Sequence, residues 1–238
     1  LSQNGETLHN HKHHQILTDG RMVVIDSGAE TNMNYCSDFT RTFPSSGKFT
    51  QQQKEIYQIV SAANNLAIDL ARPGVTYKEV HLAACRLIAQ GLNNLGLMKG
   101  DVDEAVASGA HALFMPHGLG HNMGLDVHDM EDLGENYVGY DDTIQRSTQF
   151  GLASLRMGRM LQPGHVLTVE PGIYFIPALI DKWKAEGINK DFVNFEALDA
   201  YRTFGGIRLE DDIVITGNGC KLLGAKRLPI TVEDVERE

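Results

Sequence analysis

Five residues constrain this chain more than any others: four carboxylates and one imidazole, each inside an ordered local motif. Oxygen donors with a single nitrogen are the ligands that hard divalent cations prefer, and this much negative charge is costly in a pocket without counter-ions. The set therefore predicts a site at which two divalent cations share ligands. The five residues are Asp26, Asp38, His121, Glu170 and Glu210.

The bulk composition is that of an ordinary soluble globular protein. A chain of 238 residues is long enough for one large domain or two small ones, and 42% of its residues are apolar and 22% charged. The formal net charge is -10, and no run of Lys or Arg offers a basic surface, so we expect no nucleic-acid partner. Two bound divalent cations would change this charge from -10 to -6.

Cysteine content and hydropathy indicate the compartment. The three cysteines Cys36, Cys85 and Cys220 are odd in number and lack CxxC spacing, which favours free thiols and a reducing, cytoplasmic location. No apolar run approaches the roughly 18 residues of a membrane span, and we expect no membrane association. Because the chain opens at Leu1 in the polar stretch 2–7, we expect a fragment that begins within a domain.

A hairpin is predicted near the start of the chain. Residues 22–25 form an apolar run that ends at Asp26, as a buried strand would, and residues 38–43 alternate like a returning strand. This hairpin would carry one metal ligand on each arm.

Two amphipathic helices and further strands follow. Thr50–Gln53 and Thr76–Glu79 are capping boxes, with Pro73 and Gly74 between the helices and the second helix ending near Gly96. Residues 166–174 and 206–215 resemble strands, whereas 130–162 and 178–204 read as irregular excursions at the rim of the site. Two helices between strand pairs predict an α+β or mixed α/β domain.

Alternation along strands gives each carboxylate an orienting neighbour two residues away. Glu170 would share a face with Thr168, and Glu210 with Arg208, although a structural salt bridge to Arg208 is an alternative role for Glu210. The run Val-Glu-Pro-Gly-Ile-Tyr is expected to place Glu170 inside an apolar strand.

Three histidines within twelve residues, beside these acids, predict ligation instead of core packing. The two glycines between His117 and His121 favour a strand or loop over a helix, and His128 follows seven residues later.

Taken together, these motifs resemble the pita-bread metallopeptidases, and within them the proline-specific branch that contains aminopeptidase P and prolidase. The resemblance implies an α+β pita-bread fold with a central curved, mostly antiparallel sheet flanked by helices. Residues 1–238 would be one metallopeptidase catalytic domain, N-terminally incomplete. The motifs, in order from about His9 to Leu223, are 25–28, 37–44, 117–121, 124–129, 161–164, 169–174 and 206–212.

The resemblance also implies a role for each site residue. Asp38 and Glu210 would bridge two divalent ions, usually Mn²⁺ with Co²⁺ or Zn²⁺ as substitutes, while Asp26 completes one ion and His121 and Glu170 complete the other. Glu170 would also shuttle a proton. His9 would be a substrate-pocket histidine. His117 and His128 would line the pocket and assist the tetrahedral intermediate, and Arg208 would hydrogen-bond within the site.

The activity within this branch depends on Arg156. Residues 154–159 and the segment that ends at Arg208 are similar to animal-type prolidases, in which an arginine at this place holds the C-terminal carboxylate of a dipeptide. The implied function is hydrolysis of Xaa-Pro dipeptides, by a protein that could form a homodimer. The alternatives are an Xaa-Pro aminopeptidase acting on longer peptides, with Arg156 a surface residue, and a metal-free, non-catalytic binding module or creatinase-like relative.

One departure from the family pattern concerns the hairpin. Asp26 and Asp38 are twelve residues apart, whereas eleven is typical of the family. We expect the extra residue in the turn at 31–34, because a one-residue register shift would turn Asp38 to the wrong face.

Overall fold

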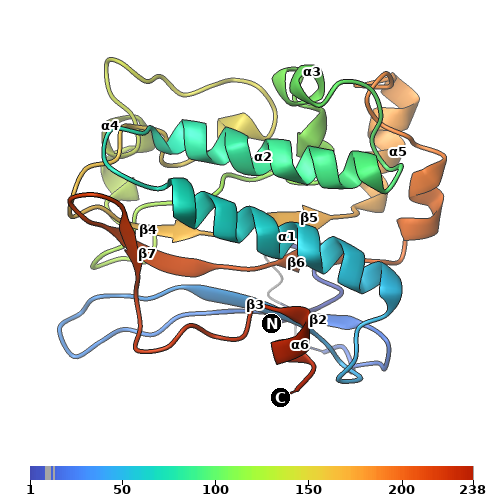
Figure 1. Cartoon of the computed structure of the whole chain (residues 1–238), viewed down its shortest axis with the longest axis horizontal. Helices are drawn as coiled ribbons and strands as arrows, with labels where there is room; N and C mark the ends of the chain where they lie inside the picture. Colours follow the sequence, from blue (N-terminus) through green and yellow to red (C-terminus); the bar gives the residue numbers. More distant parts are fainter. Residues whose placement is uncertain (9–11, 13, 238) are drawn as a thin grey trace.

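The computed structural model describes residues 1–8, 12 and 14–237, so His9 lies outside the described residues. Two long helices lie across a set of antiparallel strands (Figure 1). The strands form three ladders, in the orders β1-β2-β3, β4-β7-β8 and β5-β6. Their bounds are β1 Ser2–Gln3, β2 Met22–Ser27, β3 Phe39–Pro44, β4 Val166–Val169, β5 Gly172–Tyr174, β6 Gly206–Arg208, β7 Asp211–Ile215 and β8 Cys220–Leu222.

The predicted hairpin is confirmed as β2 and β3. Its register is continuous, since Asp26 pairs with Thr40 and the bridge between Glu30 and Cys36 keeps the same alignment. Asp38 lies two residues before Thr40 and therefore faces the same side as Asp26. The extra residue thus lies in the turn after Glu30, and the alternative of a shifted register is wrong.

The later strands are shorter than predicted, because each run breaks at a metal-ligand candidate. Glu170 lies between β4 and β5, and Glu210 lies between β6 and β7. The expectation that Glu170 sits inside a strand is therefore wrong: Pro171 has no amide hydrogen to continue the ladder. Each glutamate therefore lies where one strand has ended and the next has not yet begun.

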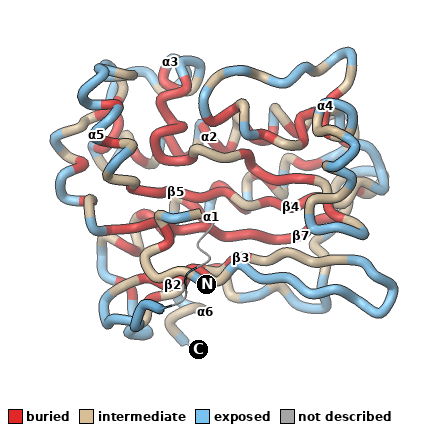
Figure 2. Tube along the Cα trace, turned by 180° about the vertical axis from the view of Figure 1, so that it is seen from behind, coloured by how far each residue is buried: buried red, intermediate tan, exposed pale blue. Residues whose placement is uncertain are grey.

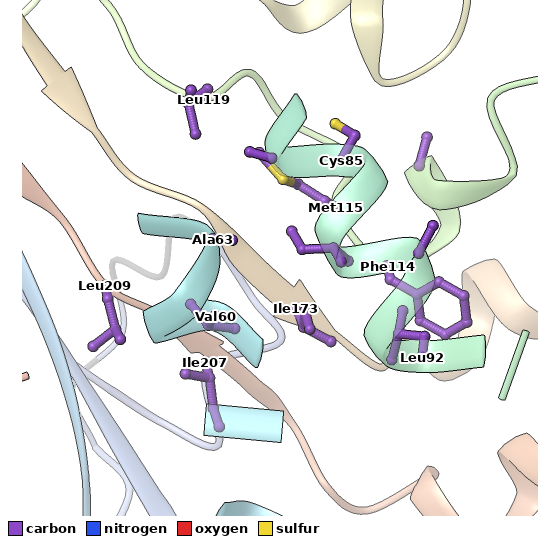
Figure 3. Close-up of a cluster of buried hydrophobic side chains, with 14 of the residues drawn as sticks. Val60, Ala63, Cys85, Leu92, Phe114, Met115, Leu119, Ile173, Ile207 and Leu209 are labelled. Atoms are coloured by element: carbon purple, nitrogen blue, oxygen red, sulfur yellow. The ribbon is translucent and has the colours of Figure 1, made fainter. Parts of the chain in front are cut away.

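Both capping boxes are confirmed. Helix α1 (Gln51–Leu70) begins after Thr50, and α2 (Tyr77–Asn94) begins after Thr76; in each, the side chains of the cap and of the third helical residue exchange hydrogen bonds with the backbone. Their apolar faces form the core with the strands, where α1 residues approach Ile207 and Leu209 and α2 residues approach Phe114 (Figure 3). A view from the opposite side shows the buried strands and the exposed hairpin tip (Figure 2).

The excursions contain more helix than expected. The segment 178–204 includes most of α5 (Pro177–Glu186), which begins at a proline and ends at Gly187 with φ 66°. Its Ile180 and Trp183 are buried in the core, so the expectation that this segment is irregular and borders the site is wrong. The short helices are α3 Val102–Ala107, α4 Glu135–Val138, α6 Val232–Val235, η1 Ala110–Leu113, η2 Glu131–Leu133, η3 Leu152–Ser154 and η4 Ala197–Tyr201. In the described part of the chain no helix combines the length and apolarity needed to cross a membrane.

Candidate metal centre and cavity

The predicted ligands converge on one point. Donor atoms of Asp38, His121 and Glu210 all lie within 4.8 Å of one another. Nε2 of His121 is 3.7 Å from Oδ2 of Asp38 and 3.7 Å from Oε1 of Glu170. These four side chains come from the hairpin, a loop and two strand breaks, and the fold brings them together as the motifs predicted.

Asp26 joins this group through Arg208. The guanidinium of Arg208 forms an ion pair with Oδ2 of Asp26, whose side chain is 42% exposed, against 7% for Arg208. Asp26 therefore faces open space at the edge of the group. Arg208 pairs with Asp26 and not with Glu210, which removes the alternative of a structural Glu210–Arg208 bridge.

The two glutamates are positioned from behind by Asn64 on α1. Its buried amide nitrogen donates to the carbonyl oxygens of Val169 at 2.9 Å and Leu209 at 3.3 Å. These are the residues immediately before Glu170 and Glu210. One side chain therefore ties both strand breaks to the helix, and no local sequence pattern predicts this role.

The loop that carries His121 packs directly on β4. The amide of His121 donates to Oγ1 of Thr168 at 3.1 Å, and the Glu170 amide donates to the carbonyl of Leu119 at 2.8 Å. A Cβ on Gly120 would lie 2.1 Å from the Thr168 carbonyl oxygen, so only glycine allows this approach. As predicted, the segment is a loop and not a helix.

The His121 ring is oriented for ligation. Its Nδ1 lies 3.0 Å from the carbonyl oxygen of Asn122, and a hydrogen bond there places the proton on Nδ1. The lone pair of Nε2 then points toward the carboxylates. Backbone acceptors commonly fix metal-ligating histidines in this way.

A hydrogen-bonded chain connects the carboxylates to His117. Oγ1 of Thr40 donates to Oε2 of Glu210 at 2.6 Å and accepts from Nε of Arg208 at 3.1 Å. Arg208 also donates to the Tyr174 hydroxyl at 3.2 Å, which lies 3.0 Å from Nε2 of His117. Arg208 thus contacts both Thr40, which hydrogen-bonds to Glu210, and Tyr174, which lies beside His117.

Burial and mutual repulsion disfavour ionised carboxylates here. Burial, followed by the charges of Glu170 and Asp38, raises the pKa of Glu210 well above its ordinary value. Burial also raises the pKa of Glu170, although His121 and Arg208 oppose this. For His121, burial lowers the pKa, but the interactions with the neighbouring carboxyl groups of Asp38 and Glu170 outweigh it, so the pKa is raised.

The donor set fits divalent cations. Oε1 of Glu210 is buried and has no hydrogen-bond partner among the described residues, which leaves its lone pairs for another ligand. Four carboxyl groups and one imidazole gather beside Arg208 in the cavity wall, so the available donors are mostly oxygen atoms with one nitrogen. Hard oxygen donors with one imidazole nitrogen are the ligands that divalent cations prefer.

The ligands line a cavity of about 800 Å³. Its wall also contains His117, His128, Arg156 and Arg208, so every predicted site residue in the described ranges borders one space. His9, predicted for the same pocket, is not described, although Leu8 lines it.

His128 and Arg156 are linked by a residue that the sequence analysis missed. Oε2 of Glu131 lies 3.3 Å from Nδ1 of His128 and 2.5 Å from a guanidinium nitrogen of Arg156. Glu135 is a second partner of Arg156, at 3.3 Å. Nothing in the local pattern marks Glu131, whereas Asp212, which accepts the Asp38 amide at 3.1 Å, shares the alternation of Glu210 and could have been found.

Known proteins of one family match this chain. A family model described as Metallopeptidase family M24 matches residues 1–217. The Xaa-Pro dipeptidase of Homo sapiens is 42% identical over 222 residues, which cover 92% of this chain and 43% of that protein. A probable Xaa-Pro aminopeptidase of Fusarium vanettenii is 39% identical over 214 residues, which cover 90% of this chain and 43% of that protein.

Solved structures agree with these matches. A variant of Escherichia coli aminopeptidase P in complex with substrate superposes with a TM-score of 0.76 at 39% identity. Zn-substituted E. coli aminopeptidase P in complex with product gives a TM-score of 0.74 at 39% identity. Each match covers 98% of this chain and 44% of the other, so the chain spans less than half the length of these relatives. The fold predicted from the motifs is confirmed.

Proposed function

The chain belongs to metallopeptidase family M24, and from that premise we propose that it hydrolyses Xaa-Pro peptide bonds as a dipeptidase. One observation carries the proposal: five metal-ligand side chains converge on the wall of a cavity that also contains Arg156. The names of the relatives support cleavage before proline.

The ions proposed for the centre are two Mn²⁺, with Co²⁺ or Zn²⁺ as substitutes. Asp38 and Glu210 would hold both ions, Asp26 would complete the set on one side, and His121 and Glu170 on the other. When bound, two such ions supply an activated water nucleophile and polarise the scissile carbonyl. The unpartnered Oε1 of Glu210 supports its bridging role.

The residues around the centre handle the proton and the developing charge. Glu170 has a raised pKa because it is buried, which suits a carboxylate that accepts a proton from the nucleophile and passes it to the leaving nitrogen. His117 and His128 border the cavity and would donate hydrogen bonds to the tetrahedral intermediate. Arg208 keeps Asp26 and Tyr174 in place.

Arg156 determines the substrate length in this proposal. A guanidinium binds a carboxylate bidentately, so Arg156 would hold the C-terminal carboxylate of an Xaa-Pro dipeptide. Its side chain is 37% exposed and borders the cavity, which supports that role. A longer peptide has no carboxylate at this point.

The pairing of Arg156 with Glu131 and Glu135 favours a second candidate function. A guanidinium already neutralised by two carboxylates is a weaker anchor for a third, and an Xaa-Pro aminopeptidase would not need one. Under this alternative the protein removes the first residue from longer Xaa-Pro peptides. Relatives of both types match the chain at similar identity.

A substrate-length series distinguishes the two. Full-length, manganese-loaded protein is assayed on Gly-Pro and on a tripeptide and pentapeptide with proline second. A dipeptidase cleaves Gly-Pro best, and Arg156→Ala lowers its kcat/KM on Gly-Pro by at least about 100-fold, the worth of a charged hydrogen-bonded pair. Arg159→Ala, on the same excursion but outside the cavity lining, is the matched control and should have little effect.

Preference for the longer peptides, with Arg156→Ala nearly neutral, would establish the aminopeptidase instead. No hydrolysis of any Xaa-Pro bond, together with no bound metal, would favour the non-catalytic binding module.

Four further properties are proposed. The three cysteines are free thiols, which supports a reducing, cytoplasmic location. The partner is a peptide with proline after the scissile bond, and a homodimer is proposed for the whole protein. Residues 1–238 are proposed to belong to one metallopeptidase catalytic domain.

A further inference from the structure

A second group of metal-ligand side chains lies in the core, apart from the cavity. His81 and Cys85 are one turn apart on α2, and His111 lies on η1. All three are buried, with exposed fractions of 0%, 0% and 1%. One donor atom from each lies within 4.8 Å of the other two, and none of these residues lines the cavity of the first centre.

No hydrogen bond among the described residues accounts for the burial of the His111 imidazole. Neither of its ring nitrogens has a hydrogen-bond partner anywhere in the described residues. Leaving a buried polar group unpaired destabilises the folded state, and an apolar residue at this position would avoid the penalty. An imidazole with both nitrogens unpartnered, beside a second imidazole and a thiol, points to a ligand that the three residues share.

The protonation state of the cluster suits a metal that displaces one proton. Burial lowers the pKa of His81 to about 3 and that of His111 to about 4, so both rings are neutral and keep a lone pair at neutral pH. Burial raises the pKa of the Cys85 thiol, so the thiol is protonated until an ion binds. Neutral imidazole and thiolate are the forms that ligate metals.

The spacing of the donors is compatible with one ion. In a trigonal three-coordinate site with bonds of about 2.0–2.3 Å, the ligand atoms lie roughly 3.5–4.0 Å apart. The Cys85 Sγ is 3.4 Å from Nε2 of His81, and binding draws His111 inward from a separation of at most 4.8 Å. Met115 lies close to Cys85 in the core (Figure 3), and the burial of all three side chains excludes water from the site.

We propose that His81, Cys85 and His111 form a separate, three-coordinate site for a soft metal ion, and that the ion is Cu⁺. Thiolate with imidazole selects soft ions over the hard ions of the first centre. One thiolate balances one positive charge, so bound Cu⁺ leaves the core neutral, whereas Zn²⁺ would leave a net charge of +1 there. On binding, the S–H bond breaks, an S–Cu bond forms, two N–Cu bonds form, and the proton leaves to solvent.

The test is Cu⁺ binding by full-length protein whose first centre is already saturated with Mn²⁺. Binding is measured anaerobically in competition with a chromogenic Cu⁺ chelator, both on native protein and after refolding with Cu⁺, because the site is enclosed. We expect one Cu⁺ per chain. Cys85→Ala should weaken binding by at least about 100-fold, since loss of an outer partner alone costs 10–100-fold.

The chain offers matched controls in its other cysteines. Cys36→Ser and Cys220→Ser should bind Cu⁺ like the wild type, and His111→Leu should lose binding. Equal binding by wild type and Cys85→Ala would overturn the proposal, as would no binding by the wild type. A His111→Leu variant that is more stable, in a protein that takes up no Cu⁺, would identify His111 as an unpaired core residue only.

Discussion

Asp212 is the buried carboxylate whose replacement tests the charge balance of the metal centre most directly. It lies on β7, is 1% exposed, and accepts the Asp38 amide hydrogen at 3.1 Å. Burial raises the pKa of Asp212 to about 7 from 3.8, and the negative charge of Asp38 adds to this, although the hydrogen bond opposes it. We expect Asp212→Asn to stabilise the metal-free protein above pH 7.

The sign follows from proton binding. Between pH 3.8 and about 7 the folded state keeps a proton on Asp212 that the unfolded chain has released, so wild-type stability falls as the pH rises through this window. A shift of about three pKa units, at about 1.4 kcal/mol each, gives an upper limit of about 4 kcal/mol. Asparagine keeps an acceptor for the Asp38 amide but carries no charge, so the variant does not lose this free energy.

The assay is urea unfolding of chelator-treated protein at about pH 4 and pH 8. The variant should gain up to about 4 kcal/mol at the higher pH and almost nothing at the lower, and Mn²⁺ should shrink the gain because cations favour the ionised aspartate. Asp211→Asn is the control: Asp211 pairs with Arg41 and Arg227, so its loss should destabilise at both pH values. An Asp212→Asn variant that is less stable at pH 8, or equally shifted at both, refutes the reasoning.

Three further outcomes are expected. Asn64→Leu removes hydrogen bonds to the two carbonyls before the glutamates, and should lower the unfolding free energy by about 2–3 kcal/mol and weaken Mn²⁺ binding, as measured by urea unfolding and metal titration. Gly120→Ala places Cβ 2.1 Å from the Thr168 carbonyl oxygen, and calorimetry should show a loss of about 1–3 kcal/mol. Burial lowers the pKa of His81 to about 3, so the unfolded chain binds a proton below pH 6.5 that the folded state does not. Wild-type stability should therefore fall as the pH drops from 6.5 toward 3, and His81→Leu should flatten that part of the urea-unfolding profile.

Local sequence signals were sufficient for the helix starts and the hairpin. Thr50 and Thr76 predict the starts of α1 and α2 because a capping box involves only four consecutive residues. The alternation of residues 38–43 fixes the face of Asp38, and the observed register keeps it. Helix α5 was missed because only Ile180 and Trp183 mark its buried side, among charged neighbours.

The residues next to Glu170 and Glu210 do not predict that these glutamates lie at breaks between strands. The apolar runs around Glu170 and Glu210 resemble continuous strands, but β4 ends at Val169 and β6 ends at Arg208. The residue that holds both breaks, Asn64, is more than 100 residues away on α1. Glu131 was missed for the same reason, since its partner Arg156 lies 25 residues further along an excursion with no periodicity.

Arg208 offsets part of the negative charge that the carboxyl groups bring to this centre. Arg208 is the buried cation that pairs with Asp26, and its pKa, although lowered by burial, is raised overall by Tyr174, Glu170 and Asp26. One guanidinium cannot neutralise five neighbouring carboxyl groups, so some of them keep protons in the metal-free state, as the raised pKa values of Glu170, Glu210 and Asp212 indicate. Cation binding must displace those protons, and the affinity of the centre for metal should therefore rise with pH until they are gone.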